Sequence, residues 1–302
     1  MDSKITYDIF HLMYWDWRVV LDFFLGGIAV GAFLYAIGLM FYRKDDQLVS
    51  VKVGSMVGPI AMIAALSFLL AEMGHPTQIY KTLTGFNFTS TMSWGGAIQI
   101  CFIILSIVFV VSLFCNISKT VRWNVGMIAG FFAIFVTVYQ GFLLSFVTAR
   151  PLWNAGAVSI ISIFLSFNTG VATVLLVTCF SKRVRNEMRE IVSAQGKSLD
   201  YIVKYFMLIS ILVQLTTCFI WIVTLIMGKA DSVNAYYVLM HNYGYHFWIG
   251  VIGVGLIAPF IILAVWCSGK LKDSPIPIFV TIPILVGGFF FRYILILAGQ
   301  LS

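Results

Sequence analysis

The stretch 125–147, VGMIAGFFAIFVTVYQGFLLSFV, identifies the class of fold, because it carries no charge and is long enough to cross a bilayer as one helix. Tyr139 and Gln140 lie side by side within it, and the turn Arg150-Pro151-Leu152-Trp153-Asn154 follows it. Lipid offers no hydrogen-bond partner to a phenol or an amide. Something polar must therefore meet these two side chains inside the membrane.

The composition as a whole excludes a soluble domain. Hydrophobic residues make up 61% of the protein and charged residues 10%, and the mean hydropathy is +0.98. The alternating pattern of a membrane barrel is absent. No cleavable signal peptide is expected, because the first apolar run is too long and its leading flank is acidic. The sequence predicts an all-α integral membrane fold with eight transmembrane helices, at 19–42, 53–71, 95–115, 125–147, 156–180, 205–227, 247–267 and 275–298.

The basic residues predict the orientation of these helices. Most of the 19 Lys and Arg residues fall in the loops after the first, third, fifth and seventh runs. Since cytoplasmic loops carry an excess of Lys and Arg, both termini should lie outside, together with the loops 72–94, 148–155 and 228–246. The net charge of +7 then reflects topology, and no nucleic-acid partner is expected.

Polar residues of the first four runs should gather near the outer surface. Asp22 lies a few residues below that surface, Glu72 ends the second run there, and Trp94 and Gln99 open the third run. Tyr139 lies about nine residues before the outer end of the fourth run, roughly 13 Å deep at about 1.5 Å per residue. The polar groups of four consecutive helices are therefore predicted to meet in one bundle.

The protein should divide into two four-helix bundles, residues 1–155 with the polar cluster and residues 156–302. In the second bundle, Asn168 and Gln214 fall near mid-membrane, and Arg292 falls in the outer third of the last run. The halves show no clear sequence repeat, so an inverted-repeat transporter is not predicted.

Two glycines of the first run, Gly27 and Gly31, are spaced for close packing. This spacing allows the close approach of another helix or of a flat ligand. Both alternatives are open from the sequence.

The sequence lacks the ligands of a resident redox centre. None of the four His residues lies in a predicted membrane interior, so no haem is expected. The five Cys residues are scattered singly, which excludes an Fe–S motif in this protein and suggests no disulfide framework. If the protein handles electrons, it must borrow redox centres from a partner or from a diffusible cofactor.

Each candidate residue also has a structural interpretation. An ionisable residue inside a membrane costs about 2.5–3.5 kcal/mol on insertion, which favours a functional role for Asp22, although its shallow depth reduces this cost. Tyr139 could be a packing residue, Glu72 could be solvated at its helix end, and Arg292 could snorkel or pair. Trp94 and Trp153 could be ordinary interface residues, and His75 could lie in a turn set by Gly74 and Pro76.

Several segments, in order along the whole sequence, resemble the NrfD/PsrC-type family, the membrane subunits of polysulfide-reductase-like complexes. Segment 24–32 resembles the Gly-rich first helix of that family, and 287–300 resembles its C-terminal helix. Residues 139–153 resemble its Tyr-x-Gly…Ala-Arg-Pro-x-Trp block, and 87–95 resembles its Ser-Pro-Met-Ser-Trp-Gly segment. Each motif is weak alone, but together they are fairly specific.

Two of the segments depart from the family pattern. Glu72-Met73-Gly74-His75-Pro76 resembles the family's Asp-Leu-Gly-Arg-Pro turn, with Glu for Asp and His for Arg. Thr91 stands where the family's third-helix segment usually has Pro. Because His titrates near about pH 6.5, the charge of this turn at neutral pH stays open.

The resemblance implies a quinone-reactive subunit of a bacterial or archaeal cytoplasmic membrane, with menaquinone or ubiquinone as the cofactor. It places Tyr139 at the quinone headgroup, with Asp22 as the nearest candidate from the first helix. Because Asp22 and Glu72 share the depth of Tyr139, either of them is expected to be the proton partner. The full set of expected quinone-binding residues is Tyr139, Gln140, Asp22, Gly27, Gly31, His75, Trp94, Gln99, Arg150 and Trp153.

The resemblance also implies partners outside the membrane: an extracytoplasmic Fe–S subunit and a molybdopterin catalytic subunit. The predicted function is therefore the membrane anchor and quinone-reactive subunit of a respiratory oxidoreductase. Two alternatives remain, a proton-coupled transporter that uses Asp22, Glu72 and Arg292, and a purely structural anchor without a quinone site.

Overall fold

The computed structural model describes residues 15–43, 47–72, 85–115, 117–147, 150–153, 156–179, 199–268 and 278–301. Every regular element in these ranges is a helix. The elements are α1 (Trp17–Arg43), α2 (Val49–Glu72), α4 (Thr91–Phe114), α5 (Lys119–Ser145), α6 (Gly156–Cys179), α8 (Leu199–Ile226), α9 (Ala230–Tyr245), η2 (His246–Ile257), α10 (Ala258–Cys267) and α11 (Ile278–Leu301).

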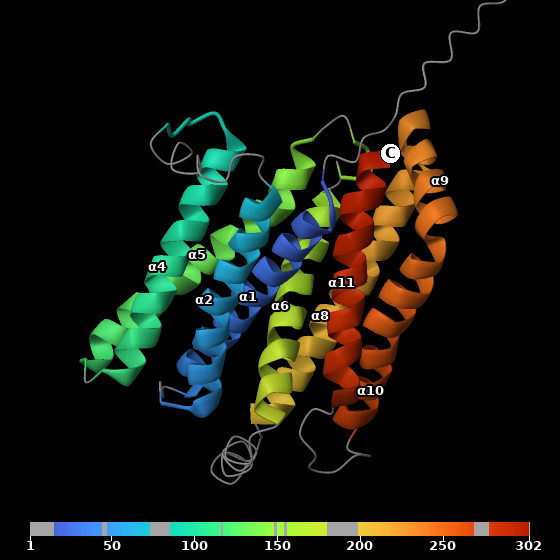
Figure 1. The fold of residues 1–302 in the computed structure, drawn as a ribbon. Helices are drawn as coiled ribbons and strands as arrows, with labels where there is room; N and C mark the ends of the chain where they lie inside the picture. Colours follow the sequence, from blue (N-terminus) through green and yellow to red (C-terminus); the bar gives the residue numbers. More distant parts are fainter. Residues whose placement is uncertain are drawn as a thin grey trace, which may run out of the picture.

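Eight helical spans in the described ranges are long and apolar enough to cross a membrane. Seven are single helices, and the remaining one is the run α9–η2–α10, Ala230–Cys267. The spans lie side by side and follow roughly one direction (Figure 1). The predicted all-α fold with eight spans is confirmed.

The seventh span begins earlier than predicted. We expected a loop at 228–246, but Ala230–Tyr245 form helix α9. Asp231, Asn234 and His241 lower the hydropathy of this segment, which is why it did not read as part of a span. Such residues do not prevent a helix, and Asp231 in the first turn interacts favourably with the positive end of the helix dipole.

Helix α1 packs against helices of both predicted bundles. It contacts α2 along its length and α6 on another face, and α6 in turn contacts α5, α8 and α11. A Cβ atom added at Gly31 would collide with the backbone of Ser166 and come within 3.0 Å of the Gly170 Cα. Glycine at these positions lets the two helix backbones touch. The two bundles predicted to divide at 155/156 are therefore in extended contact with each other, through α1 and α6.

The beginning of α1 and the end of α11 lie at the same end of the molecule. The Trp15 amide donates to Gln300 Oε1 at 2.8 Å, and Gln300 Nε2 donates to the Trp15 carbonyl at 2.9 Å. The helix order then puts the end of α2, the beginning of α4 and the end of α5 at this end as well (Figure 1). Which end faces the cytoplasm stays a prediction.

Candidate functional site

A cavity of about 250 Å³ lies between α1, α2, α4 and α5, near the end of the molecule that holds Trp15. Its wall combines polar groups from four helices with apolar side chains. The lining residues are Trp15, Val19, Asp22, Phe23, Leu66, Leu69, Glu72, Met92, Gly96, Gln99, Ile100, Tyr139, Gln140 and Leu143. Five residues that the sequence predicted to lie close together line this cavity: Asp22, Glu72, Gln99, Tyr139 and Gln140.

Two polar residues of this cavity are buried and carry atoms without a hydrogen-bond partner among the described residues. Asp22 is 5% exposed and Gln140 is 2% exposed. Asp22 Oδ1 and both amide atoms of Gln140 make no hydrogen bond to any described residue. A buried polar atom without a partner costs about 1–3 kcal/mol. Three such atoms at one cavity indicate a site that a polar ligand or water completes.

Two glycines create the space for the polar side chains of α5. A Cβ atom added at Gly26 of α1 would collide with Gln140 Nε2, and one added at Gly95 of α4 would collide with the ring of Tyr139. Both side chains thus lie directly against glycine backbone. Asp22 also lies within electrostatic reach of the Tyr139 hydroxyl.

Glu72 lies at the rim of the cavity, where α2 ends. Its carboxylate faces Arg18, with 3.6 Å between Arg18 Nη1 and Glu72 Oε2. Arg18 also donates to the Ala71 carbonyl at 2.7 Å and pairs with Asp16 at 3.3 Å. Glu72 is thus half-buried in a small network of charges at the helix ends.

Arg292 of α11 lies near the same cavity but is not among its lining residues. Its guanidinium donates to the Ser162 hydroxyl at 3.1 Å and to the Ser166 hydroxyl at 3.2 Å, and it is 1% exposed. It lies 5.7 Å from the centre of the Phe23 ring, which lines the cavity, and within electrostatic reach of Asp22. Pairing with polar groups away from lipid, one of the two interpretations given for Arg292, is confirmed.

Gly27 and Gly31 do not line the cavity. A Cβ atom added at Gly27 would lie 2.9 Å from Ser166 Oγ, and Gly31 faces the Ser166 backbone. Both glycines therefore serve the close approach of α6, the first of the two alternatives that their spacing allowed. The neighbouring Gly26, one residue earlier, faces the side chain of Gln140, which lines the cavity.

The turn after α5 ties the cavity end to α11. Trp153 donates from Nε1 to the Leu295 carbonyl at 2.6 Å, and its ring stacks on Trp15 at 5.3 Å. The Trp153 amide donates to the Arg150 carbonyl at 3.0 Å. Trp15 lines the cavity, whereas Trp153 and Arg150 are not among its lining residues. Trp153 thus supports a wall residue and does not form the wall itself.

Trp94 is also outside the cavity wall. It is exposed at the beginning of α4, and its Nε1 donates to the Phe88 carbonyl at 3.0 Å. This position fits the interface interpretation better than a ligand contact. His75, the other residue expected in the site, lies outside the described residues.

The sequence did not single out several wall residues. Met92, Gly96 and Ile100 of α4 follow one another at intervals of four residues, and Gly96 lies three residues before Gln99, so helical spacing from Gln99 could have found Gly96. Trp15 precedes the first apolar run, where hydropathy carries no signal for it. Gly95 adjoins Tyr139 across two helices, and no local pattern reports such a contact.

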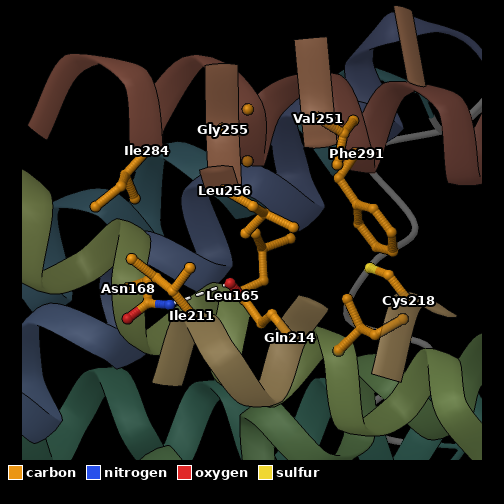
Figure 2. Close-up of a pocket in the computed structure, with 13 residues that line it drawn as sticks. Leu165, Asn168, Ile211, Gln214, Cys218, Val251, Gly255, Leu256, Ile284 and Phe291 are labelled. Carbon is orange, nitrogen blue, oxygen red and sulfur yellow. Dashed lines mark hydrogen bonds between the residues drawn. The ribbon is translucent and has the colours of Figure 1, made fainter. Parts of the chain in front are cut away.

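A second, very small cavity of about 10 Å³ lies between α6, α8, η2 and α11. Figure 2 shows Asn168 and Gln214 at one edge of it, surrounded by apolar side chains. Asn168 Nδ2 donates to Gln214 Oε1 at 3.1 Å. Asn168 Oδ1 and Gln214 Nε2 have no partner among the described residues. This volume suits at most one water molecule.

No cluster of three or more His, Cys, Asp or Glu residues in the described ranges could hold a metal ion. The fold and the cavity therefore define a multi-pass membrane protein with a partly polar cavity between its helices. Comparison with known proteins places it more narrowly. The chain belongs to the polysulphide reductase NrfD family, whose sequence model matches residues 8–302.

Individual relatives are similar over nearly their whole length. The sequence is 24% identical to the protein NrfD of Escherichia coli (strain K12), with 97% of each sequence covered. It is 22% identical to the C subunit of the polysulfide reductase of Wolinella succinogenes, with 96% of each covered. It is also 22% identical to an NrfD homologue of Haemophilus influenzae, with 95% of each covered. The resemblance noted in the sequence is confirmed.

Proposed function

We propose that this protein is the quinone-reactive membrane subunit of a respiratory oxidoreductase complex. The observation that carries the proposal is the set of unpartnered polar atoms, Asp22 Oδ1 and the Gln140 amide, in a cavity that Tyr139 also lines. Membership of a family named for polysulphide reductase supports a role in a redox complex.

The residues of the cavity fit a quinone headgroup. A quinone presents carbonyl oxygens, which accept hydrogen bonds, and a quinol presents hydroxyl groups, which donate them. The Gln140 amide and the Tyr139 hydroxyl can donate, while Asp22 Oδ1 can accept. Small-ligand sites of this kind combine a mostly apolar wall with a few convergent polar groups.

When bound, a quinol would supply two electrons and two protons. Asp22, which lines the cavity and whose Oδ1 atom has no partner among the described residues, would accept one proton. Glu72, which also lines the cavity beside Arg18, would accept the other. Tyr139 and Gln140 orient the headgroup, and the glycines at 26 and 95 hold their side chains in place.

Electrons leave through a partner, because the sequence carries no Cys motif of an Fe–S cluster. The proposed partner is an extracytoplasmic Fe–S subunit, followed by a molybdopterin catalytic subunit. It docks on the loops at the Trp15 end, which the basic-residue pattern assigns to the outside.

The test is quinone binding by the purified protein and complex, together with quinol-dependent turnover. Wild type should bind a naphthoquinone or benzoquinone, and Asp22→Asn should keep binding better than it keeps turnover. If the protein in liposomes binds no quinone but moves a solute, the transporter alternative replaces this proposal. If it does neither, the structural anchor is favoured.

A further inference from the structure

Among the described residues of the cavity wall, only Trp15 lies outside a helix. The other wall residues belong to α1, α2, α4 and α5, whose backbone hydrogen bonds hold them in place. Trp15 precedes the beginning of α1 at Trp17 and has no support of this kind. Other contacts must therefore fix the position of its indole ring.

The side chain of Gln300, in the last turn of α11, provides the first of these contacts. Its amide binds both backbone polar groups of Trp15, accepting from the nitrogen at 2.8 Å and donating to the carbonyl at 2.9 Å. Gln300 Nε2 also donates to the Ile296 carbonyl at 3.2 Å, and the residue is 7% exposed. An amide nitrogen has two hydrogens to donate, and both are used here. This buried amide therefore holds the Trp15 backbone in one position.

The ring of Trp153 provides the second contact. It stacks on the Trp15 ring with 5.3 Å between the ring centroids and 23° between the planes, a favoured geometry for aromatic pairs. Trp153 is itself fixed against α11, because its Nε1 donates to the Leu295 carbonyl at 2.6 Å and a Cβ atom added at Gly299 would collide with its ring. Trp153 thus covers one face of the Trp15 ring and leaves the rest of that side chain to the cavity that Trp15 lines.

A flat ligand in this cavity needs two kinds of contact. Polar groups such as Asp22 and Gln140 can bond to the oxygen atoms at the edge of its ring. The face of the ring needs an apolar surface, and an indole ring offers a large, flat one that favours offset stacking. Trp15 supplies such a surface, and the end of α11 holds it there although no described residue of α11 lines the cavity.

We propose that the quinone ring packs against the indole of Trp15, and that Gln300 and Trp153 are positioning residues that hold this indole in the cavity wall. This inference rests on the proposed function and extends it, because it makes the end of α11 part of a site whose walls belong to the first four spans. Packing against the ring is present in the ground state and in the transition state alike, so its loss should raise KM and leave kcat nearly unchanged.

The test is a double-mutant cycle, because a positioning residue acts only through the residue that it positions. The variants are Trp15→Leu, Gln300→Leu and the two together, in the full-length protein in lipid nanodiscs. Binding of 2-methyl-1,4-naphthoquinone is measured, and KM and kcat for the corresponding quinol are measured with the complex. Gln214→Leu is the matched control, because it also removes a buried glutamine amide from a span but does not line the cavity.

Trp15→Leu should weaken quinone binding by about three- to tenfold, as expected for the loss of an aromatic contact. Gln300→Leu should weaken it by about threefold or more in the wild-type background and by less than about twofold when Trp15 is already leucine. Gln214→Leu should lower the melting temperature but keep binding within about twofold of wild type. Trp153→Phe keeps a ring against Trp15 and loses the bond to Leu295, so it repeats the cycle with a milder change.

Two results would overturn the inference: equal weakening by Gln300→Leu in both backgrounds, or no weakening by Gln300→Leu and Trp153→Phe. A fall in kcat at unchanged KM would also contradict it. If wild type does not bind the naphthoquinone, the proposed function fails and the inference fails with it. If wild type binds and Gln300→Leu binds equally well, the inference alone fails and the proposed function stands.

Discussion

The ring of Tyr139 packs directly against the backbone of Gly95, at a point where any Cβ atom on α4 would occupy the space of the phenol. This contact fixes where the hydroxyl of Tyr139 lies relative to the cavity. Gly95 lies about one turn after the beginning of α4 at Thr91. A packing glycine thus determines the position of a candidate ligand-binding side chain.

Gly95→Ala adds only one methyl group, but it should weaken quinone binding, because this group would displace the ring of Tyr139. Overpacking of this kind costs about 1–3 kcal/mol, which corresponds to roughly tenfold or more in quinol affinity if the Tyr139 ring is displaced. Gly38→Ala is the matched control, because it makes the same change in a span helix at a glycine where a Cβ atom has room and which does not line the cavity. Quinone affinity of the two variants is measured side by side. Equal affinities for Gly95→Ala and Gly38→Ala would contradict the role of this contact.

Arg292 should matter for turnover and little for assembly. Replacing a buried arginine by leucine removes an insertion cost of about 2.5–3.5 kcal/mol, so Arg292→Leu should accumulate in the membrane at least as well as wild type. Quinol turnover should fall about tenfold, because Asp22 loses the nearby positive charge. Arg292→Lys keeps the charge and should retain more turnover than Arg292→Leu. Wild-type turnover in Arg292→Leu would show the residue to be dispensable.

Asn168 and Gln214 should behave as a coupled pair. Asn168→Leu leaves both amide atoms of Gln214 without a partner, which costs about 1–3 kcal/mol, and Gln214→Leu does the same to Asn168. The double variant removes all of these polar atoms and should melt at a higher temperature than either single variant. Thermal unfolding in detergent measures this, and a double variant that simply adds the two losses would argue against a closed pair.

The orientation has its own test. In a protein whose native cysteines are replaced by alanine, Ser198→Cys should react with a membrane-impermeant maleimide only from the cytoplasmic side. Thr89→Cys, which is exposed near the beginning of α4, should react only from outside. This follows from the excess of Lys and Arg in the loop that contains Ser198. The reverse pattern would invert the molecule and move the docking face to the cytoplasm.

Hydropathy and depth predicted much of this protein. Each apolar run became a helix, because a segment of this composition has no other stable way to satisfy its backbone in lipid. The alternating direction of successive helices predicts that Asp22, Gln99, Tyr139 and Gln140 lie at similar depths, and all four line the same cavity. Those two arguments need only the sequence.

The sequence could not predict which residues touch between helices, because these contacts depend on how each helix is rotated about its own axis. Gly27 and Gly31 face α6, and Gly26 faces Gln140, although the three residues lie close together in the sequence. The π-helical segment His246–Ile257 was also not predicted. It lies where the backbones of Gly255 and Gly287 meet, a relationship between residues far apart in the sequence.

The most direct test of the central claim compares two activities of one purified complex, for wild type and Tyr139→Phe. One activity is turnover with quinol, and the other is turnover with an artificial electron donor that bypasses the membrane subunit. Removing one hydroxyl while keeping the ring costs about 0.5–1.5 kcal/mol, so quinol turnover should fall up to roughly tenfold while donor-dependent turnover stays unchanged. Equal quinol rates in wild type and Tyr139→Phe would remove Tyr139 from the site and contradict the account.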